Sequence, residues 1–467
     1  MVLFNTLGRR KEEFKPLDGK VAKIYSCGPT VYSSPSIGNM RAYIFVDTLK
    51  KALEYCGFGV LDVMNVTDVG HLQSDADDGE DKMEVSARKH KISPQDIAKR
   101  YTDEFFSFCD KLNIRRPNIV APATQFIDKM IEHNKELEKR GFAYRTSDGL
   151  YFDSSRFKNY YALSKKKPVG DKAGLRVSIG EKKNANDFCL WRVTPKTALQ
   201  KWDSPWGVGV PGWHIECSAI ARACLGDTID IHTGGVDHIP IHHTNEIAQS
   251  ESVTGKRFAR FWLHNEFIMI DGGKMSKSLG NVYTVADVEA RGFSPLSFRY
   301  LVLKAHYRSI VNFTWESLKA AQIAYGNLVK ELARHSGPIS TMMMHPVEQY
   351  RAEFRKHIED DLNMPKALAF VWELVKHAPH RDIYDLVIEF DQILSLGLES
   401  AVAEHAKNAE KHVKSTKIPV VIKKIADARM DAKARKDWVA ADKLREEIKV
   451  LGYEIIDTKD GYEVRQV

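Results

Sequence analysis

Cysteine is scarce in this sequence, and long apolar runs are missing from it. The 467 residues include six cysteines, which have no dense or regular spacing. A small secreted domain held together by disulfides is therefore excluded. No apolar stretch is long enough to cross a bilayer, and the N-terminus lacks the apolar region of a signal peptide. We predict a cytoplasmic protein that does not associate with membranes.

The remaining composition is that of an ordinary globular protein. Hydrophobic residues make up 43% of the chain and charged residues 28%, and the formal net charge is +7. A chain of this length predicts about two to four domains. The modest positive charge is compatible with a polyanionic partner, but many soluble enzymes have a similar charge. Cys56, Cys109 and Cys189 stand among apolar neighbours and are predicted to be buried and inert.

The most informative segment is a pair of lysines in a glycine-flanked loop. Lys274 and Lys277 are separated by Met275 and Ser276, and two glycines precede them. Glycine makes such a loop mobile, and lysine supplies a compact charge for phosphate oxygens. A lysine pair alone is as typical of a solvated surface as of a binding loop. The full string KMSKS is more specific and favours a loop that binds a triphosphate.

A second nucleotide-binding feature lies near the N-terminus. Residues Val21–Ser26 have the composition of a short strand, and Tyr43–Tyr55 carry apolar side chains at helical spacing. Between them, Ser36–Asn39 (SIGN) stand where the first strand leads into a helix, the nucleotide-binding position of a parallel α/β sheet. Gly38 allows a ring or a phosphate to approach the backbone, and the helix N-terminus offers N–H groups to anions.

These two features and four further motifs resemble a known family. Ser36–Asn39 and Lys274–Ser278 stand in the places of the HIGH and KMSKS signatures of class I aminoacyl-tRNA synthetases, and the chain most resembles the cysteinyl-tRNA synthetases. The motifs that carry this narrower resemblance are Cys27–Tyr32 (CGPTVY), Gly212–Ala219 (GWHIECSA), His242–Ser250 (HHTNEIAQS) and Ala305–Ser309 (AHYRS). The resemblance extends over nearly the whole chain.

The resemblance implies an α/β fold with further domains attached. A class I Rossmann-type, doubly wound parallel sheet forms the catalytic domain, and strand and helix patterns alternate as such a sheet requires. An inserted connective domain interrupts it, and a C-terminal α-helical anticodon-binding domain and a small tail subdomain follow. The implied boundaries are 1–120 and 201–255 for the two Rossmann halves, 121–200 for the insertion, 256–315 for the KMSKS loop and stem-contact region, 316–405 for the helical bundle, and 406–467 for a linker and the small C-terminal subdomain.

The resemblance also implies one zinc ion per chain, bound by Cys27, Cys217, His242 and Glu246. His242 and Glu246 are four residues apart in a helical stretch and so project from one face. The sequence spacing does not show that the four residues converge. Thiolate, imidazole and carboxylate ligands suit zinc. Cys224 is interpreted as a packing residue; His238 and His243 are interpreted as residues that support the ligands.

We predict that the zinc selects the amino acid. Cysteine and serine differ by one atom, and a pocket that measures size alone separates such substrates weakly. Zinc binds a thiolate and lowers its pKa, whereas an alcohol stays protonated and is a poor ligand. The alternative is a zinc that only stabilises the fold. Trp213 is predicted to form the floor of the amino-acid pocket beside Cys27, with ordinary core packing as the alternative.

The implied reaction has two steps, activation of L-cysteine by ATP with Mg²⁺ and transfer of the cysteinyl group to tRNA(Cys). Positioning and charge stabilisation carry the first step. Lys277, and to a lesser degree Lys274, would hold the β- and γ-phosphates. Ser36–Asn39, with Ile37 and Gly38 between them, would line the ATP site. The family expectation is a monomer.

Ser36 departs from the family pattern, which has a histidine at this position. Serine can donate a hydrogen bond, but it carries no positive charge and has a shorter reach. Losing one charge-stabilising donor costs about a hundredfold or more in rate. Either another donor compensates, or adenylate formation is slow; we favour compensation because the other motifs are intact.

The C-terminal part of the sequence is helical throughout. Residues 407–424 contain six lysines and one acid and are interpreted as a solvated linker. A single helix is predicted over Val421–Val450, followed by a hairpin-like tail over Tyr453–Arg465. The family often has a tryptophan where Val464 stands, which leaves the anticodon-reading residues open; Tyr462 is one candidate.

Two other functions compete with a cysteine–tRNA ligase. The cysteine ligase of the mycothiol pathway has the same zinc site but lacks the C-terminal part, which is present here as residues 316–467. A non-catalytic tRNA-binding paralogue is suggested only by Ser36. Cysteine-dependent ATP turnover separates an enzyme from a binding protein, and attachment to tRNA separates the two enzymes.

Overall fold

The structure, a computed structural model, describes the ranges 1–70, 81–165, 181–276, 279–337, 346–415, 419–458 and 461–466. The chain divides into two units, of which the first comprises Met1–Leu328 and His335–Gly397 and the second Val329–Arg334 and Leu398–Val467. No helix within the described ranges is both long and apolar enough to cross a membrane.

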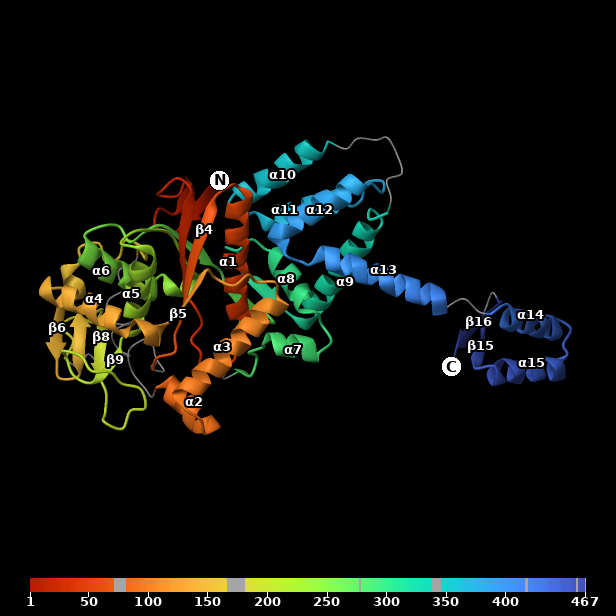
Figure 1. Ribbon diagram of the computed structural model, residues 1–467, viewed down its shortest axis with the longest axis horizontal. Coiled ribbons are helices and arrows are strands. Elements are labelled where there is room, and N and C mark those ends of the chain that lie inside the picture. Colours follow the sequence, from red (N-terminus) through yellow and green to blue (C-terminus); the bar gives the residue numbers. More distant parts are fainter. Residues whose placement is uncertain are drawn as a thin grey trace. The chain divides into compact units, whose positions relative to one another are not determined.

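A five-stranded parallel sheet forms the centre of the first unit (Figure 1). The strands are, in their order across the sheet, β11 (Ala259–Asn265), β10 (Ile229–Gly235), β3 (Val21–Ser26), β4 (Gly59–Val66) and β5 (Ile119–Pro122). The chain builds the sheet outward from β3 through β4 to β5, and then returns to add β10 and β11 on the other side. The order of the strands therefore reverses between β3 and β10, and open α/β sheets bind their ligands in the crevice beyond the carboxyl ends of the strands at such a point. The predicted doubly wound α/β fold is confirmed.

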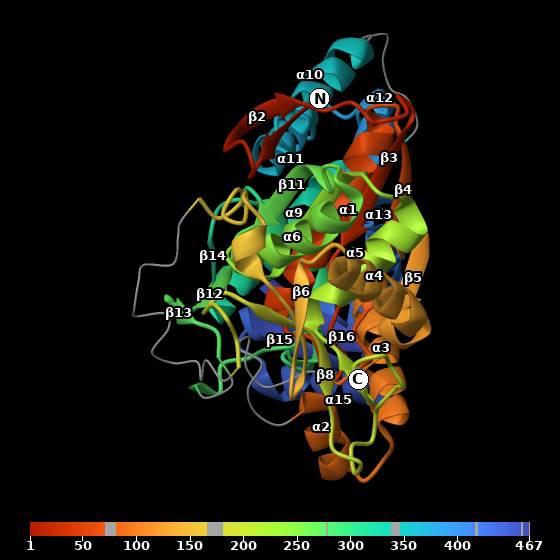
Figure 2. The same cartoon turned by 90° about the vertical axis from the view of Figure 1, so that its left-hand side faces the viewer.

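Helices cover both faces of this sheet. Helix α1 (Ile37–Tyr55) lies on one face, and α5 (Trp213–Leu225) and α6 (His242–Thr254) lie side by side on the other (Figures 1 and 2). The apolar side chains of α5 and α6 join those of β3, β4 and β11 in one core, which includes Ile215, Ile220 and Trp262. The sequence predicts three buried cysteines. Cys109 and Cys189 are buried, whereas Cys56, the C-cap residue of α1, is half-buried.

Helix α1 begins six residues before the predicted start at Tyr43. Gly38 and Asn39 have weak helix propensity, but Ser36 caps the helix and compensates for them. The Ser36 hydroxyl oxygen accepts a hydrogen bond from the N–H of Asn39, and the Asn39 side chain accepts one from the N–H of Ser36. This reciprocal capping box satisfies two N–H groups at the helix start.

In the chain, a second sheet is inserted between the two halves of the central sheet. Helix α4 (Ile127–Lys139) follows β5, and four antiparallel strands come next and lie toward the viewer in Figure 2. These strands are β6 (Ala143–Thr146), β7 (Gly149–Phe152), β8 (Phe188–Val193) and β9 (Gly209–Pro211). The last of them leads through Gly212 directly into α5.

A small three-stranded sheet carries the segment that contains Lys274. Its strands, in order, are β13 (Gly273–Lys274), β12 (Ile268–Ile270) and β14 (Val311–Phe313). The remaining elements of this unit are β1 (Val2–Asn5), β2 (Arg10–Glu13), α2 (Lys82–His90), α3 (Pro94–Lys111), α7 (Val285–Ala290), α8 (Pro295–Leu303), α10 (Val347–Glu359), α11 (Met364–Leu374) and α12 (Arg381–Leu394), and α9 (Trp315–Ala333) continues into the second unit.

The second unit differs from the sequence expectation in two places. The predicted linker over 407–424 is largely helical, because α13 (Leu398–Ser415) runs through its first half and α14 (Val420–Ala434) begins within it. The single helix predicted over Val421–Val450 is two helices, since Lys436 adopts a left-handed conformation (φ 60°) and α15 (Trp438–Val450) starts after it. The predicted hairpin is confirmed as β15 (Tyr453–Thr458) and β16 (Gly461–Gln466), on which Val464 pairs with Ile455.

Candidate metal centre and nucleotide-binding loops

Cys27 lies at the point where the strand order of the central sheet reverses. It is the first residue after β3, and its N–H donates to the carbonyl oxygen of Thr233 on β10. The next residue, Gly28, donates its N–H to the side chain of Asn65 at 2.8 Å. A Cβ atom on Gly28 would lie 1.6 Å from the backbone oxygen of Asn65, so only glycine fits here. The turn after β3 is thereby held against β4, with the thiol of Cys27 at the crevice.

Helices α5 and α6 bring three more candidate ligands to the same place. Cys217 lies in the second turn of α5, and its sulfur is 4.0 Å from that of Cys27. His242 and Glu246 lie one turn apart on α6, with 3.0 Å between Nε2 and Oε1. One ligand atom from each of the four residues lies within 4.8 Å of every other. The structure thus brings together Cys27, Cys217, His242 and Glu246, which sequence spacing could not show.

The four side chains are electrostatically coupled. Burial raises the pKa of the Cys27 thiol, and the nearby Cys217 raises it further. Burial acts against ionisation of Cys217 as well, but the hydrogen bond with Cys27 and the charge of His242 bring its pKa down to about 6. Burial disfavours the charged form of His242, yet Glu246 and Cys217 raise its pKa to about 10. The cluster therefore holds negative charge on Cys217 and Glu246 next to a protonated His242, and a metal cation could take the place of that proton.

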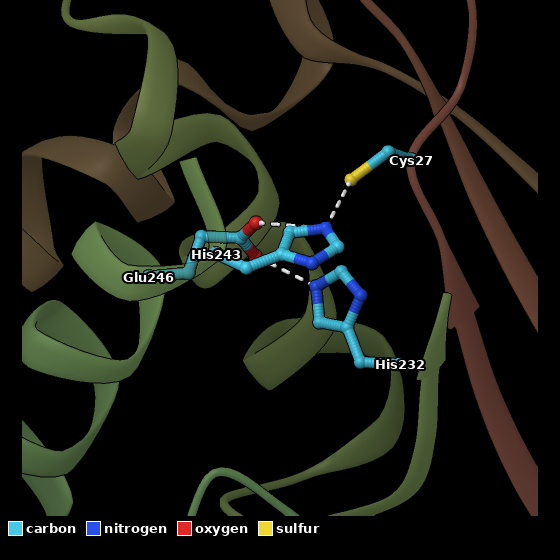
Figure 3. Close-up of side chains that lie close together, drawn as sticks. All are labelled: Cys27, His232, His243 and Glu246. Carbon is cyan, nitrogen blue, oxygen red and sulfur yellow. Dashed lines mark hydrogen bonds and ion pairs between the residues drawn. The ribbon is translucent and has the colours of Figure 1, made fainter. Parts of the chain in front are cut away.

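A second group of donors shares two members with the first. Cys27 and Glu246 also lie with His232 and His243, with one ligand atom of each within 4.8 Å of the others (Figure 3). Nε2 of His232 is 2.8 Å from Oε2 of Glu246, and Nε2 of His243 is 3.4 Å from the sulfur of Cys27. The side chain of His264 lies beyond His243, with 2.8 Å between Nε2 of His264 and Nδ1 of His243. Sequence reasoning missed His232, although its place near the end of β10, opposite β3, was a signal.

The first donor set fits a cation better than the second. Oε2 of Glu246 is hydrogen-bonded to His232, and this contact turns Oε1 toward His242. Oε1 is buried and has no hydrogen-bond partner among the described residues, although Nε2 of His242 is 3.0 Å away. Two ligands of one zinc ion have such a separation, because each bond to nitrogen or oxygen is about 2.0–2.2 Å long. In this arrangement one carboxylate oxygen of Glu246 could hold an ion while His232 orients the other.

Trp213 lies beside this cluster, at the first position of α5. Its ring stacks on that of His242, with centroids 4.5 Å apart and an interplanar angle of 29°, and the ring of His238 meets it edge-on. The side chain is half-buried, unlike the fully packed tryptophans of the core. Trp213 therefore forms one wall of the metal cluster, and part of its side chain remains exposed.

The two nucleotide-loop motifs contact each other. The N–H of Ile37 donates to the carbonyl oxygen of Tyr283 at 2.8 Å, and Ser36 pairs with Thr284 in an isolated bridge. A Cβ atom on Gly38 would lie 3.4 Å from the side chain of Met275. The start of α1 thus contacts the lysine segment both before residue 277, at Met275, and after residue 278, at Tyr283 and Thr284.

Lys274, the first of the two lysines, stands at the end of a hairpin. Lys274 is exposed on the edge strand β13, and its carbonyl oxygen accepts a hydrogen bond from the side chain of Asn281 at 3.0 Å. The side-chain oxygen of Asn281 in turn accepts the N–H of Ser276 at 2.8 Å. Lys277, the second predicted phosphate ligand, and Ser278 lie outside the described residues.

The family model and the curated relatives identify one family, and a solved structure shows the shared fold. Residues 13–323 match the family described as "tRNA synthetases class I (C) catalytic domain". The chain is 41% identical to "Cysteine--tRNA ligase 1" of Burkholderia lata, over 99% of this chain and 96% of that protein. It is 43% identical to "Cysteine--tRNA ligase" of Treponema denticola, over 96% of each. Among solved structures, Mycobacterium tuberculosis methionyl-tRNA synthetase in complex with methionyl-adenylate shares the fold, with a TM-score of 0.57, 15% identity, and coverage of 82% of this chain and 91% of that one.

Proposed function

Because the chain belongs to the cysteine–tRNA ligase family of class I tRNA synthetases, we propose that it activates L-cysteine with ATP and transfers it to the 3′ end of tRNA(Cys). The similarity extends over both the catalytic part and the C-terminal helices, since the relatives are matched over 96% of their own length. The mycothiol-pathway ligase, which lacks the C-terminal part, therefore accounts for this chain less well.

The observation that carries the proposal is the convergence of Cys27, Cys217, His242 and Glu246 at the crevice. We propose that these residues hold one zinc ion, with His232 orienting the carboxylate of Glu246. When bound, the ion supplies a Lewis acid that binds a thiolate and binds an alcohol poorly. A cluster built into the crevice, rather than between outer elements, supports substrate selection over a purely stabilising role.

Trp213 is proposed as the wall against which the substrate side chain packs. Its ring contacts His242 on one side and is half-buried, so part of it stays available to a ligand. Serine bound in the same place would lack the thiolate, and its methylene contact with the indole would not compensate.

The nucleotide loops are proposed to bind ATP with Mg²⁺. Gly38 and Asn39 would line the adenosine site at the start of α1, and Lys274 and Lys277 would hold the β- and γ-phosphates as charge develops in the transition state. Ser36 uses its hydroxyl to cap α1, and so it would act by shaping the N-terminus of this helix rather than by donating a charge.

We propose that the domains follow the boundaries that the sequence indicates. Residues 1–120 and 201–255 would form the catalytic halves, 121–200 the connective insertion, 256–315 the lysine-loop and stem-contact region, and 316–405 the anticodon-binding bundle. Residues 406–467 would form the tail subdomain, with the end of α13 in place of a solvated linker. A monomer that works in the cytoplasm, where its tRNA is found, completes the proposal.

Transfer of radiolabelled cysteine to tRNA(Cys) tests the proposed function. The zinc-loaded protein is expected to make acid-precipitable cysteinyl-tRNA in the presence of ATP, with no product from serine. Cysteine activation without transfer would favour a ligase with another acceptor. Binding of tRNA without activation would favour the non-catalytic paralogue and overturn the proposal.

A further inference from the structure

Arg41 is buried one turn after the first nucleotide motif, although arginine is rarely buried. Only 1% of the surface of Arg41 is exposed to solvent. The guanidinium donates to the carbonyl oxygens of Phe267 and Ser309, and more weakly to those of Tyr307 at 3.4 Å and His306 at 3.5 Å. Within the described residues it forms no ion pair with a carboxylate. These carbonyl oxygens replace the water that would solvate the guanidinium. Losing any one of the contacts would leave the buried charge poorly solvated.

The carbonyl groups that bind Arg41 belong to the starts of two strands. Phe267 immediately precedes β12, and Ser309 lies two residues before β14. These parallel strands are neighbours, and β13, which carries Lys274, is added at the edge of β12. Arg41 therefore connects the helix that begins at Ser36–Asn39 with the sheet from which the lysine hairpin extends.

A ring contact reinforces this connection one turn further along α1. Phe45 stacks on Tyr307 with the ring centroids 4.5 Å apart and an interplanar angle of 14°. Arg41 and Phe45 are four residues apart, so they share one face of the helix. The turn over residues 306–309 thus packs against α1 through both a charge and an aromatic ring.

The same turn is held on its other side by Asp361. The buried carboxylate of Asp361 accepts hydrogen bonds from the hydroxyl of Tyr307 at 2.7 Å and from Nε of Arg308 at 2.9 Å, and it also accepts the N–H of Phe4 at 2.8 Å. The turn is therefore held in place by Asp361, and Arg41 binds α1 to this turn.

We infer that Arg41 is a positioning residue for nucleotide activation, which sets helix α1 at a fixed distance from the β12–β14 sheet and so from the lysine hairpin. The inference rests on the proposed function, because it assigns the ATP site to the facing ends of α1 and the hairpin. Misplacing a catalytic group by about 1 Å can cost about a hundredfold in rate. Burial lowers the pKa of Arg41 to about 10, so the guanidinium stays charged at neutral pH.

Arg299 provides a matched control. It is also a fully buried arginine that binds to α1, through the carboxylate of Asp47 at 2.7 Å, and it donates to the carbonyl oxygens of Leu394 and Leu112. It joins α1 to α8 and to the ends of α12 and α3, and among the described residues it makes no hydrogen bond to β12, to β14 or to the residues just before them. Loss of either guanidinium removes buried hydrogen bonds, but only Arg41 is hydrogen-bonded to the residues that lead into β12 and β14.

The test compares Arg41→Lys with Arg299→Lys in cysteine-dependent ATP–pyrophosphate exchange. Lysine keeps the charge but cannot reach both strand starts at once. Arg41→Lys is expected to lower kcat about ten- to a hundredfold, with the KM for cysteine and the zinc content unchanged. Each variant is assayed at the same number of degrees below its own Tm. Arg299→Lys is then expected to lower kcat less than about threefold, because no catalytic group is misplaced. Equal losses of kcat, or a loss of zinc in Arg41→Lys, would overturn the inference.

A second readout does not depend on activity. Hydrogen–deuterium exchange over residues 264–276 and 305–313 is expected to be faster in Arg41→Lys than in Arg299→Lys, since only the former releases β12 and β14. Arg41→Gln, which removes the buried charge and keeps an N–H donor, replaces Arg41→Lys if that variant does not fold. Equal exchange in the Arg41 and Arg299 variants would contradict the inference. Absence of pyrophosphate exchange in the wild-type protein would count against the proposed function instead.

Discussion

The sulfur atoms of Cys27 and Cys217 lie 4.0 Å apart, although 190 positions separate the two residues in the chain. Cys27 follows β3, the first strand of the central sheet, and Cys217 lies on α5, which comes after the inserted antiparallel sheet. The thiols meet because the second half of the sheet returns to the edge of β3. The position where the strand order reverses is therefore also where the candidate metal ligands meet.

Removing Cys217 is expected to remove the zinc. Cys217→Ala takes away one thiolate of the four donors, and a zinc site with three remaining ligands binds more weakly. The matched control is Cys224→Ala, two turns further along α5, where a half-buried thiol packs against the core and lies outside the cluster. Metal analysis after gel filtration should give about one zinc per chain for Cys224→Ala and much less for Cys217→Ala. Equal zinc content in both variants would place the metal elsewhere.

His243→Ala separates the two overlapping donor groups. If zinc is bound by Cys217 and His242, His243 only supports Cys27 from outside, and its loss should leave one zinc per chain with an affinity about ten- to a hundredfold lower. The measurement is a competition titration against a zinc-binding dye. Complete loss of zinc in His243→Ala, with retention in Cys217→Ala, would show that His232 and His243 are the ligands.

Ser36→His is expected to raise the rate of cysteine activation or leave it nearly unchanged. The substitution introduces the histidine of the family pattern but removes the hydroxyl that caps α1, which costs about 1 kcal/mol of stability. Ser93→Ala is a control for loss of the cap hydroxyl, because the Ser93 hydroxyl oxygen likewise accepts the N–H of the residue three positions later, Asp96, at the start of α3. It should lower Tm by a similar amount without changing the rate. A large fall in the rate of Ser36→His would show that the site is built around serine.

The fold was predictable from the sequence to a greater extent than the site. The strand Val21–Ser26 and the helical spacing of His242 and Glu246 are local features, and local periodicity predicted both. The start of α1 was missed because its signal is an unusual cap, with Asn39 in the place where glutamate or glutamine is expected.

The missing parts of the site are those that depend on contacts distant in sequence. His232 was overlooked because its role depends on Glu246, which reaches it from a different element. Arg41 was overlooked because the predicted helix starts after it, at Tyr43, and because a charged residue is normally solvent-exposed. Only the fold shows the carbonyl groups that surround it.

Gly38→Ala is expected to weaken ATP binding without destabilising the protein. The new methyl group would meet only the flexible end of Met275 and the Ser36 hydroxyl, each at 3.4 Å, and alanine favours a helix. It would, however, stand where the nucleotide approaches the backbone. The KM for ATP should rise about tenfold or more, by about 1.4 kcal/mol of lost binding. Gly326→Ala, at an open position within α9, should leave that KM unchanged; an equal KM in both variants would exclude Gly38 from the ATP site.

The most direct test of the account is ATP–pyrophosphate exchange by the zinc-loaded protein, with cysteine and serine compared at equal concentration. The account predicts exchange that depends on cysteine, is absent with serine, and is lost in Cys217→Ala together with the zinc. Equal exchange with cysteine and serine, or full activity in metal-free Cys217→Ala, would contradict the claim that the cluster of Cys27, Cys217, His242 and Glu246 selects the substrate.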